Sequence, residues 1–280
     1  MQVTFVSTHA TTVSKNMTLF DPQGAKVGCC GFATRQREYY RLFRVVELQS
    51  TFYKLPQAAT AKRWRSEAPS NFEFCLKAWQ VITHPATSPT WRRMTKASLP
   101  ANRAKYGHLR PTRQNFVAWE KTLEICSTLR ASVCLIQCPP SFKFSTRNAD
   151  NVRRFLGQID RGQTKLAWEP RGNWREHPEE IKELCDQLDL IHAVDILRSR
   201  PAVENVTCYF RLHGLGPKEF NYKYNYSAED LRRLQEITIG TLSGGAEEVF
   251  ILFNNLSMLK DARAFDRMMR ASQSIDSSAE

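Results

Sequence analysis

Charged and amide side chains recur at the ends of short apolar runs along this 280-residue chain. Carboxylates and cations that share one water-poor pocket can move protons and stabilise developing negative charge. Such a set of residues suits acid–base catalysis on an anionic substrate. One residue from each of seven runs belongs to the candidate set, namely Glu47, Lys77, Gln137, Glu169, Asp195, Arg211 and Asn254.

The apolar runs that carry these residues have the length and composition of buried strands. Continuous apolar runs of this kind are typical of a parallel sheet covered on both faces. The eight runs are 27–32, 45–49, 72–78, 132–138, 165–169, 190–195, 207–213 and 248–255. Helix-like spacing alternates with them at 36–43, 58–67, 113–130, 147–159, 178–187, 227–237 and 258–271. Pro178 and Ser227 are typical helix starts, because acidic residues follow each of them.

This alternation predicts an α/β fold, a single TIM-like (β/α)₈ barrel, with an open doubly wound sheet as the alternative. The connection 196–206 is too short for a full helix, so we expect an incomplete helix after strand six. We expect an N-terminal arm of unknown structure at 1–25, the barrel at 26–272 and a C-terminal tail at 273–280.

The strand C-termini of a parallel barrel share one face, so the polar strand ends are predicted to line a single pocket. A purely structural pairing across the barrel is the alternative interpretation. In that case Glu47 or Glu169 would bind Lys77 or Arg211 only to close the barrel.

The formal charge of +12 favours contact with nucleic acid, phosphorylated ligands or an anionic surface. Basic residues concentrate in the third connection, 84–113, which includes Arg92, Arg93, Trp91 and Tyr106. The segment 217–226 repeats the mixture of lysine and tyrosine. Basic side chains interleaved with aromatic rings can grip phosphates while the rings stack on bases. The alternative is a solvated basic loop.

Several classes of site are disfavoured. The eight cysteines form no C-x-x-C pair, and no G-x-S-x-G segment occurs. The N-terminus lacks a secretory apolar region and no run is long enough to span a bilayer, so we expect a cytoplasmic protein with reduced thiols and no membrane partner. One divalent cation is a candidate cofactor, because Asp195, Glu47, Glu169 and His213 offer a mixed oxygen and nitrogen set.

Six segments together resemble the DUF72 family, also called the YecE-like family, and the chain looks closer to its archaeal members. They are VELQSTFYKLP (46–56), FEFCLKAWQVITH (72–84), LIQCPPSF (135–142), WEPRGNW (168–174), YFRLHG (209–214) and FILFNN (250–255). The resemblance covers about residues 26–270 and implies a TIM-barrel-like fold, but no secure activity. It also implies that Tyr53, His84 and Trp174 belong to the site.

Two functions compete at this stage. The first is a hydrolase of phosphodiesterase or nuclease type that acts on an anionic phosphoester or nucleic-acid-derived substrate. Its expected catalytic residues are Glu47, Lys77, Glu169, Asp195, Arg211 and His213. Its expected substrate-binding residues are Tyr53, His84, Gln137, Arg171, Trp174, Asn254, Arg92 and Arg93. The second is a protein that binds nucleic acid or an anion without chemistry. Glycosidic cleavage by paired carboxylates fits the barrel but leaves the basic loops unexplained.

Overall fold

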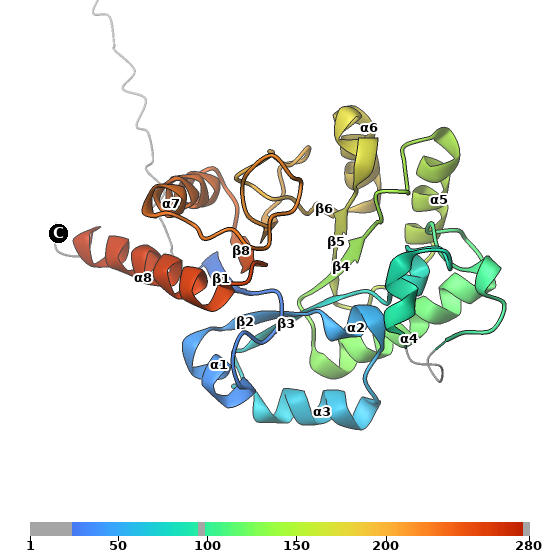
Figure 1. Ribbon diagram of the computed structural model, residues 1–280, viewed down its shortest axis with the longest axis horizontal. Coiled ribbons are helices and arrows are strands. Elements are labelled where there is room, and N and C mark those ends of the chain that lie inside the picture. The colour runs from blue at the N-terminus through green and yellow to red at the C-terminus, as the bar shows by residue number, and fades with distance from the viewer. Residues whose placement is uncertain (1–23, 95–98, 277–280) are drawn as a thin grey trace, which may run out of the picture.

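The computed structural model describes residues 24–94 and 99–276 (Figure 1). The expected arm, 1–25, lies outside the described residues except for its last two positions, which lead into the first strand. The last helix continues to Asp276. The division of the chain into an arm, a barrel and a tail stays a prediction.

Eight parallel strands form one sheet. They are β1 Ala25–Cys29, β2 Val45–Leu48, β3 Glu73–Lys77, β4 Val133–Gln137, β5 Lys165–Glu169, β6 Ile191–His192, β7 Thr207–Leu212 and β8 Glu248–Phe253. Their order is β6-β5-β4-β3-β2-β1-β8-β7. The ends of this order meet at one bridge between Val194 and Phe210, where Arg211 N donates to Val194 O at 2.8 Å. The predicted barrel is therefore confirmed as a nearly closed one, and the open doubly wound alternative is wrong.

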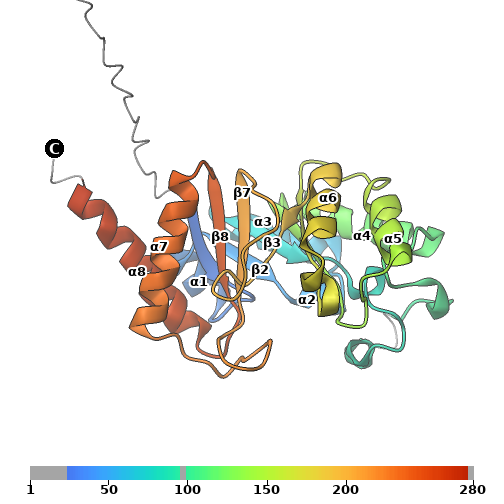
Figure 2. The same ribbon diagram turned by 90° about the horizontal axis from the view of Figure 1, so that it is seen from above.

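Helices cover the outer face of the sheet. They are α1 Gln36–Leu42, α2 Ser50–Tyr53, α3 Ala58–Glu67, α4 Arg113–Leu129, α5 Thr146–Leu156, α6 Pro178–Leu188, α7 Ala228–Ser243 and α8 Met258–Asp276. Two views show α7 and α8 side by side at one end of the molecule and α4, α5 and α6 at the other (Figures 1 and 2). Between β6 and β7 the chain forms turns and no helix, so the connection holds no full helix, as expected, but the incomplete helix expected there is absent as well.

The helix starts follow the signals in the sequence. Ser227 Oγ accepts a hydrogen bond from Asp230 N at 3.1 Å, and the Asp230 carboxylate accepts one from Ser227 N at 2.8 Å. This reciprocal pair satisfies two backbone donors that a helix N-terminus leaves open. Pro178 occupies the first turn of α6, where its missing N–H costs nothing.

The barrel interior is filled in layers. Apolar side chains fill its middle, among them Val45, Cys75, Leu135, Tyr209 and Phe250. Beneath them, at the strand N-termini, four charged residues form an ion-pair network. Lys26 Nζ lies 2.6 Å from Glu73 Oε1, and Lys165 Nζ lies 2.5 Å from Glu248 Oε2, while Lys26 also binds Glu248. The interior is therefore closed below, and its polar upper layer faces the strand C-termini.

Candidate active site above the barrel

The polar strand ends point into the barrel because side chains alternate along a strand with a period of two. Val45, Cys75, Leu135, Ala167 and Tyr209 belong to the apolar layer inside the barrel. The residue two positions further along each strand must therefore also face inward. These residues are Glu47, Lys77, Gln137, Glu169 and Arg211, so one layer contains most of the predicted set.

Arg211 is the centre of this layer. Its Nε donates to Glu47 Oε2 at 2.9 Å and its Nη2 donates to Glu47 Oε1 at 2.8 Å. Its Nη1 binds Glu169 Oε2 and lies 3.3 Å from Gln137 Oε1. The Tyr209 hydroxyl donates to Glu47 Oε2 at 2.9 Å. Arg211 is 1% exposed and Glu47 is fully buried, so neither can touch a substrate in this arrangement.

The roles expected for Glu47 and Arg211 as catalytic residues therefore need correction. Both act as positioning residues that hold the upper layer together, which agrees with the structural pairing considered as the alternative. The structure shows that Arg211, and not Lys77, forms ion pairs with both Glu47 and Glu169.

Glu169 is held as a carboxylate by two guanidinium groups. Burial alone would raise its pKa, but Arg171 and Arg211 outweigh burial and keep the pKa well below its usual range. Arg171 Nε donates to Glu169 Oε1 at 2.7 Å. A carboxylate held this strongly in its ionised form is a poor proton donor or acceptor near neutral pH. Glu169 therefore fixes Arg171 and Arg211 in place, and the acid–base role expected of it is not supported.

The residues proposed to hold a divalent cation do not fit one. Within residues 24–94 and 99–276, no group of three or more His, Cys, Asp or Glu side chains is arranged to bind a metal ion. The oxygens of Glu47 and Glu169 face arginine nitrogens instead. The expectation of a metal site formed with Asp195 and His213 is wrong for this arrangement.

Lys77 lies beside this network and is 7% exposed. Its Nζ lies 4.0 Å from the centroid of the Phe52 ring. Burial and, next, the nearby charge of Arg211 lower its pKa from 10.5 to about 7, against the opposing effect of Glu47. Both the neutral and the charged form of the amine are therefore populated near pH 7.

A cavity of about 550 Å³ opens above β5 and β6. Its walls contain Glu169, Asp195 and His213 from the predicted set. Four arginines from the strand-end loops also line it, namely Arg171, Arg175, Arg198 and Arg200. Glu219 is a third carboxyl residue of the lining, so the four arginines exceed the carboxyl residues by one, which suits an anionic ligand.

Asp195 is the titratable carboxyl of this cavity. Its side chain is 8% exposed, and it accepts hydrogen bonds from His213 N at 2.9 Å and from Leu197 N at 3.3 Å. Burial raises its pKa from 3.8 to about 6, in opposition to those backbone donors and to Arg198. Asp195 can therefore change its charge near neutral pH, as an acid–base group must.

His213 links Asp195 to the central network. Its Nε2 lies 3.2 Å from Arg211 Nη1, and its Nδ1 lies 4.0 Å from Asp195 Oδ2. Because a guanidinium only donates, Nε2 must accept and the ring proton lies on Nδ1, toward Asp195. Burial lowers the pKa of His213 well below its usual range, and Arg211 adds to that effect. His213 is thus a neutral ring, and its backbone N–H, not the ring, is the group that hydrogen-bonds to Asp195.

The loop after β7 covers part of the cavity. The Phe220 ring lies 4.2 Å from the Arg171 guanidinium and 5.0 Å from the His213 ring. Tyr222 stacks near Phe220 with ring centroids 6.2 Å apart and is 45% exposed. The expectation that 217–226 lies beside the pocket agrees with these contacts.

Other expected substrate contacts lie elsewhere. Trp174 is fully buried against Phe142, Phe144 and Trp168, and its Nε1 donates to Phe142 O at 2.7 Å. Trp174 therefore stabilises the core, and the contact expected with substrate is wrong. His84 is 4% exposed, and its Nδ1 lies 2.8 Å from Thr83 Oγ1. Burial lowers the pKa of His84 to about 3.

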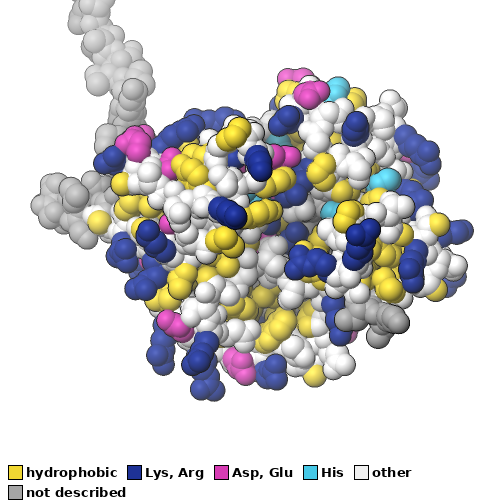
Figure 3. All heavy atoms as spheres, viewed as in Figure 1, with side chains coloured by type: hydrophobic (Ala, Val, Ile, Leu, Met, Phe, Trp, Pro, Cys, Tyr) yellow, Lys and Arg dark blue, Asp and Glu magenta, His cyan; other side chains and the backbone are white. Residues whose placement is uncertain are grey.

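The basic third connection forms a separate surface feature. Arg93 Nη1 donates to the Tyr53 hydroxyl at 2.6 Å, and the guanidinium lies 4.1 Å from the Tyr53 ring. Arg92 is exposed beside it. The described lining of the cavity includes neither these residues nor Asn254, which is half-buried and whose N donates to Leu212 O at 2.8 Å. Lys and Arg side chains are spread widely over the face shown in Figure 3.

Residue type and spacing alone missed Arg175, Arg198, Arg200 and Phe220. A local signal existed for three of them, because each arginine follows a strand-end carboxylate within six residues. Arg198 Nε donates to Gly214 O at 3.0 Å, which ties the connection after β6 to the loop after β7.

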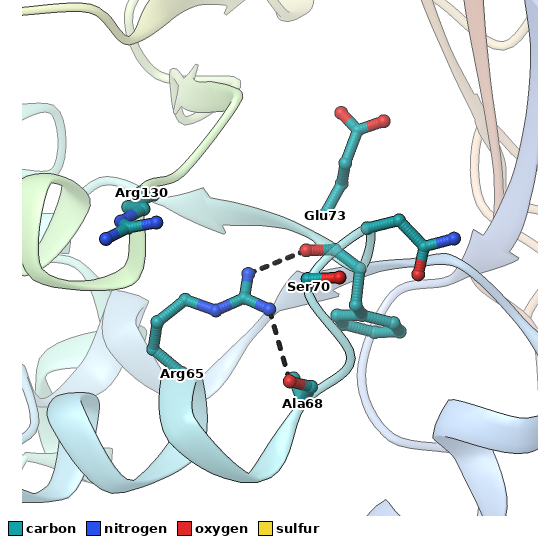
Figure 4. A pocket seen from close by; sticks show the side chains of 7 residues that line it. Arg65, Ala68, Ser70, Glu73 and Arg130 are labelled. Carbon is teal, nitrogen blue, oxygen red and sulfur yellow. Dashed lines mark hydrogen bonds between the residues drawn. The ribbon is translucent and has the colours of Figure 1, made fainter.

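A second hollow lies at the opposite end of the barrel, where α3 leads into β3 (Figure 4). Arg65 spans it, with Nη1 donating to Phe72 O at 2.7 Å and Nη2 to Ala68 O at 3.5 Å. The Arg65 guanidinium thereby fixes the turn between α3 and β3. This hollow of about 680 Å³ contains none of the strand-end residues, so we assign it a structural role.

No helix in the described part of the chain is long and apolar enough to cross a membrane.

The comparisons with known proteins agree with this architecture. The YunF protein of Bacillus subtilis (strain 168) is 24% identical over 245 residues, which cover 78% of this chain and 79% of YunF.

Solved structures show the same fold. A DUF72 protein from Enterococcus faecalis V583 matches with a TM-score of 0.64 at 19% identity and covers 89% of this chain and 97% of its own. One from Thermotoga maritima MSB8 matches with a TM-score of 0.61 at 22% identity, over 88% and 99%. Endonuclease IV from Thermus thermophilus has a TM-score of 0.50 at 13% identity, over 88% and 97%. The family model described as a protein of unknown function, DUF72, matches residues 31–279, and the chain belongs to that family.

Proposed function

We propose that this protein is an enzyme that hydrolyses a small phosphoester in the cavity above β5 and β6. The observation that carries the proposal is the placement of Asp195, whose pKa is raised to about 6, in a cavity lined by four arginines and by two further carboxyl residues, Glu169 and Glu219. Glu169 is tied to Arg171 and Arg211, whereas Asp195 can gain or lose its proton near neutral pH, as a general base must.

The arginines would hold the substrate. Arg171 is fixed by Glu169 on one side and by the Phe220 ring on the other. Arg175 and Arg200 are exposed at the cavity, and no hydrogen bond or ion pair of their side chains occurs within the described residues. Guanidinium groups bind phosphate oxygens through paired N–H donors, so these two residues suit the non-reacting oxygens.

Asp195 would transfer the proton. It removes a proton from a water molecule as that water's oxygen attacks phosphorus. The ester P–O bond breaks, and the proton then passes to the leaving oxygen. The arginines offset the negative charge that grows on the phosphoryl oxygens in the transition state. One similar fold belongs to an endonuclease, a class of enzyme that cleaves phosphodiesters, and this supports the choice of substrate class.

The test uses the full chain with p-nitrophenyl phosphate and bis(p-nitrophenyl) phosphate. Asp195→Asn keeps the shape of the side chain and is expected to lower kcat by about 100- to 10,000-fold with little change in KM. Asp186→Asn is the matched control, since Asp186 is exposed on α6 and pairs with Lys182. Equal turnover by wild type and Asp195→Asn on both substrates would refute the assignment.

The second candidate is a non-catalytic protein that binds an anion or nucleic acid, which the basic surface favours. In that case Asp195→Asn should tighten the binding of inorganic phosphate, because it removes a repelling charge. Binding should also weaken steeply as salt increases. A cytoplasmic location and a closer similarity to archaeal members of the family stay predictions.

A further inference from the structure

The side chain of His192 lies on the outer face of the sheet. Ile191 and Ala193 belong to the apolar layer inside the barrel, so His192 between them faces outward. The outward positions of the other strands carry apolar side chains, such as Phe74 on β3 and Trp168 on β5. Among the strand residues that the structure describes, His192 is therefore an exception, and its polar ring needs hydrogen-bond partners.

One ring nitrogen of His192 has a partner and the other does not. Ala202 N donates to Nδ1 at 2.9 Å, and a backbone N–H cannot accept, so the ring proton lies on Nε2. Burial lowers the pKa of His192 to about 4, against the opposing charge of Glu169, so the ring is neutral near pH 7. Nε2 makes no hydrogen bond within residues 24–94 and 99–276, yet it is not sealed from solvent. It is a free donor in a fixed ring.

The cavity above β5 and β6 reaches this ring, because His192 is half-buried and lines it. Helix α6 packs on β6 (Figure 1), and Pro178 and Ile181 are its contributions to the lining. The connection after β6 crosses the outside of the strand and adds Pro201 and Ala202. These four apolar residues and the neutral donor of His192 form what we call the α6 side of the cavity.

The α6 side differs in chemistry from the arginines of the same cavity. A charged group would lose its water in apolar surroundings without an ionic partner, which is unfavourable. An apolar group gains free energy when it leaves water, and one carbonyl or hydroxyl oxygen can accept from Nε2. A sugar with several hydroxyl groups would find few partners there.

We propose that the α6 side binds the organic part of the substrate, an apolar group that carries one acceptor oxygen, and that His192 Nε2 donates to this oxygen. The inference rests on the proposed function, in which the arginines hold the phosphoryl group. It narrows the substrate class to phosphoesters of apolar alcohols or phenols, as opposed to phosphorylated sugars. His192 thus determines specificity and takes no part in bond cleavage.

Phosphonates test the inference without turnover, because their P–C bond is not hydrolysed. Calorimetry on the full chain compares inorganic phosphate, phenylphosphonate, and the 3- and 4-acetyl derivatives of phenylphosphonate. Phenylphosphonate should bind at least about 10-fold more tightly than phosphate, because its ring leaves water. One of the acetyl derivatives should gain a further factor of about 3 to 10 through its carbonyl oxygen.

His192→Asn removes the donor but keeps the structural bond, because the Asn side-chain oxygen can accept from Ala202 N in place of Nδ1. It should abolish the gain from the acetyl group and leave the binding of phosphate and phenylphosphonate unchanged. His108→Asn is the matched control and should keep the gain. His108 is half-buried, lies outside the described lining and has a left-handed backbone, which Asn tolerates.

Three results would overturn the inference: phenylphosphonate binds no more tightly than phosphate, neither acetyl derivative gains affinity, or the gain survives in His192→Asn. The wild-type comparison decides the first two even if His192→Asn does not fold. Failure of the proposed hydrolysis is a separate outcome. Equal turnover by wild type and Asp195→Asn would remove the hydrolytic role, while phosphonate binding that depends on His192 would still establish the α6 side as a binding site.

Discussion

Arg211 on β7 binds Glu47 on β2 through two parallel hydrogen bonds, at 2.9 and 2.8 Å, although two strands lie between them in the sheet. The same guanidinium binds Glu169 on β5. Arg211 and Arg171 thus balance Glu47 and Glu169, and the upper layer of the barrel is electrically neutral without Lys77. The balance explains why Lys77 has no carboxylate partner.

Breaking this pair should destabilise the protein severely. Arg211→Met removes the cation and leaves the Glu47 carboxylate buried with only neutral donors. We expect the free energy of unfolding to fall by about 3–5 kcal/mol, the usual cost of an uncompensated buried charge. Urea unfolding followed by circular dichroism measures the change.

The double variant Glu47→Gln/Arg211→Met provides the control. It removes both charges together, so it should be more stable than Arg211→Met alone. If the single and the double variant unfold at the same urea concentration, the two charges are not coupled in the way the hydrogen bonds indicate.

Asp195 should make stability depend on pH. Its pKa is about 6 in the folded protein and about 3.9 in an unfolded chain. A raised carboxyl pKa contributes stability below the unfolded value, and that contribution disappears as pH rises through about 6. Wild type should therefore lose stability relative to Asp195→Asn between pH 4 and pH 7, by on the order of 3 kcal/mol at most. Urea unfolding of both proteins across this range measures the difference in their free energies of unfolding. A difference that does not change with pH would contradict a raised pKa for Asp195.

Local patterns in the sequence predicted most of the barrel. Residues 165–169 form a strand with the predicted bounds, because a continuous apolar run between polar turns has few alternatives. The run 190–195 shrinks to Ile191–His192, because only Val194 pairs beyond it with the next strand. The second half of the run still hydrogen-bonds to β5 through Ala193 N and to β7 through Val194.

The sequence predicted at which end of the barrel the site lies, but not which of its side chains bind one another. A period of two places Glu47 and Arg211 on the inner side, yet nothing near either residue indicates that they bind across 164 positions of sequence. Trp174 was assigned to the site because the resemblance to the DUF72 family implied it. Only the packing of Phe142, Phe144 and Trp168 around its ring shows that Trp174 lies in the core.

The structural role of Trp174 gives a direct test. Trp174→Phe keeps an aromatic ring but removes the indole donor, so Phe142 O loses its partner and a small cavity remains. We expect the free energy of unfolding to fall by about 1–3 kcal/mol. The KM for bis(p-nitrophenyl) phosphate should stay unchanged, whereas a rise in KM without loss of stability would return Trp174 to the substrate site.

The ion-pair network below the barrel should contribute more stability than a surface pair. Lys165 and Lys26 overcome the effect of burial and lower the pKa of Glu248 to about 2. Glu248→Gln should lower the free energy of unfolding by about 1–2 kcal/mol near pH 7. Glu183→Gln, which breaks the exposed pair with Arg153, should change it by less than about 0.5 kcal/mol. Equal effects of the two substitutions in urea unfolding would show that the half-buried network stabilises the protein no more than a surface ion pair does.

Phe220 should set the position of Arg171 and so the affinity for anions. Its ring covers one face of the guanidinium at 4.2 Å, while Glu169 binds the edge. Phe220→Leu removes the cation–π contact, worth about 0.5–2 kcal/mol, so phosphate binding measured by calorimetry should weaken by about 3- to 30-fold. Lys223→Ala in the same loop is the control for a general loss of positive charge. The assignment fails if Lys223→Ala weakens binding as much as Phe220→Leu, because a diffuse field would then explain the affinity better than one fixed arginine.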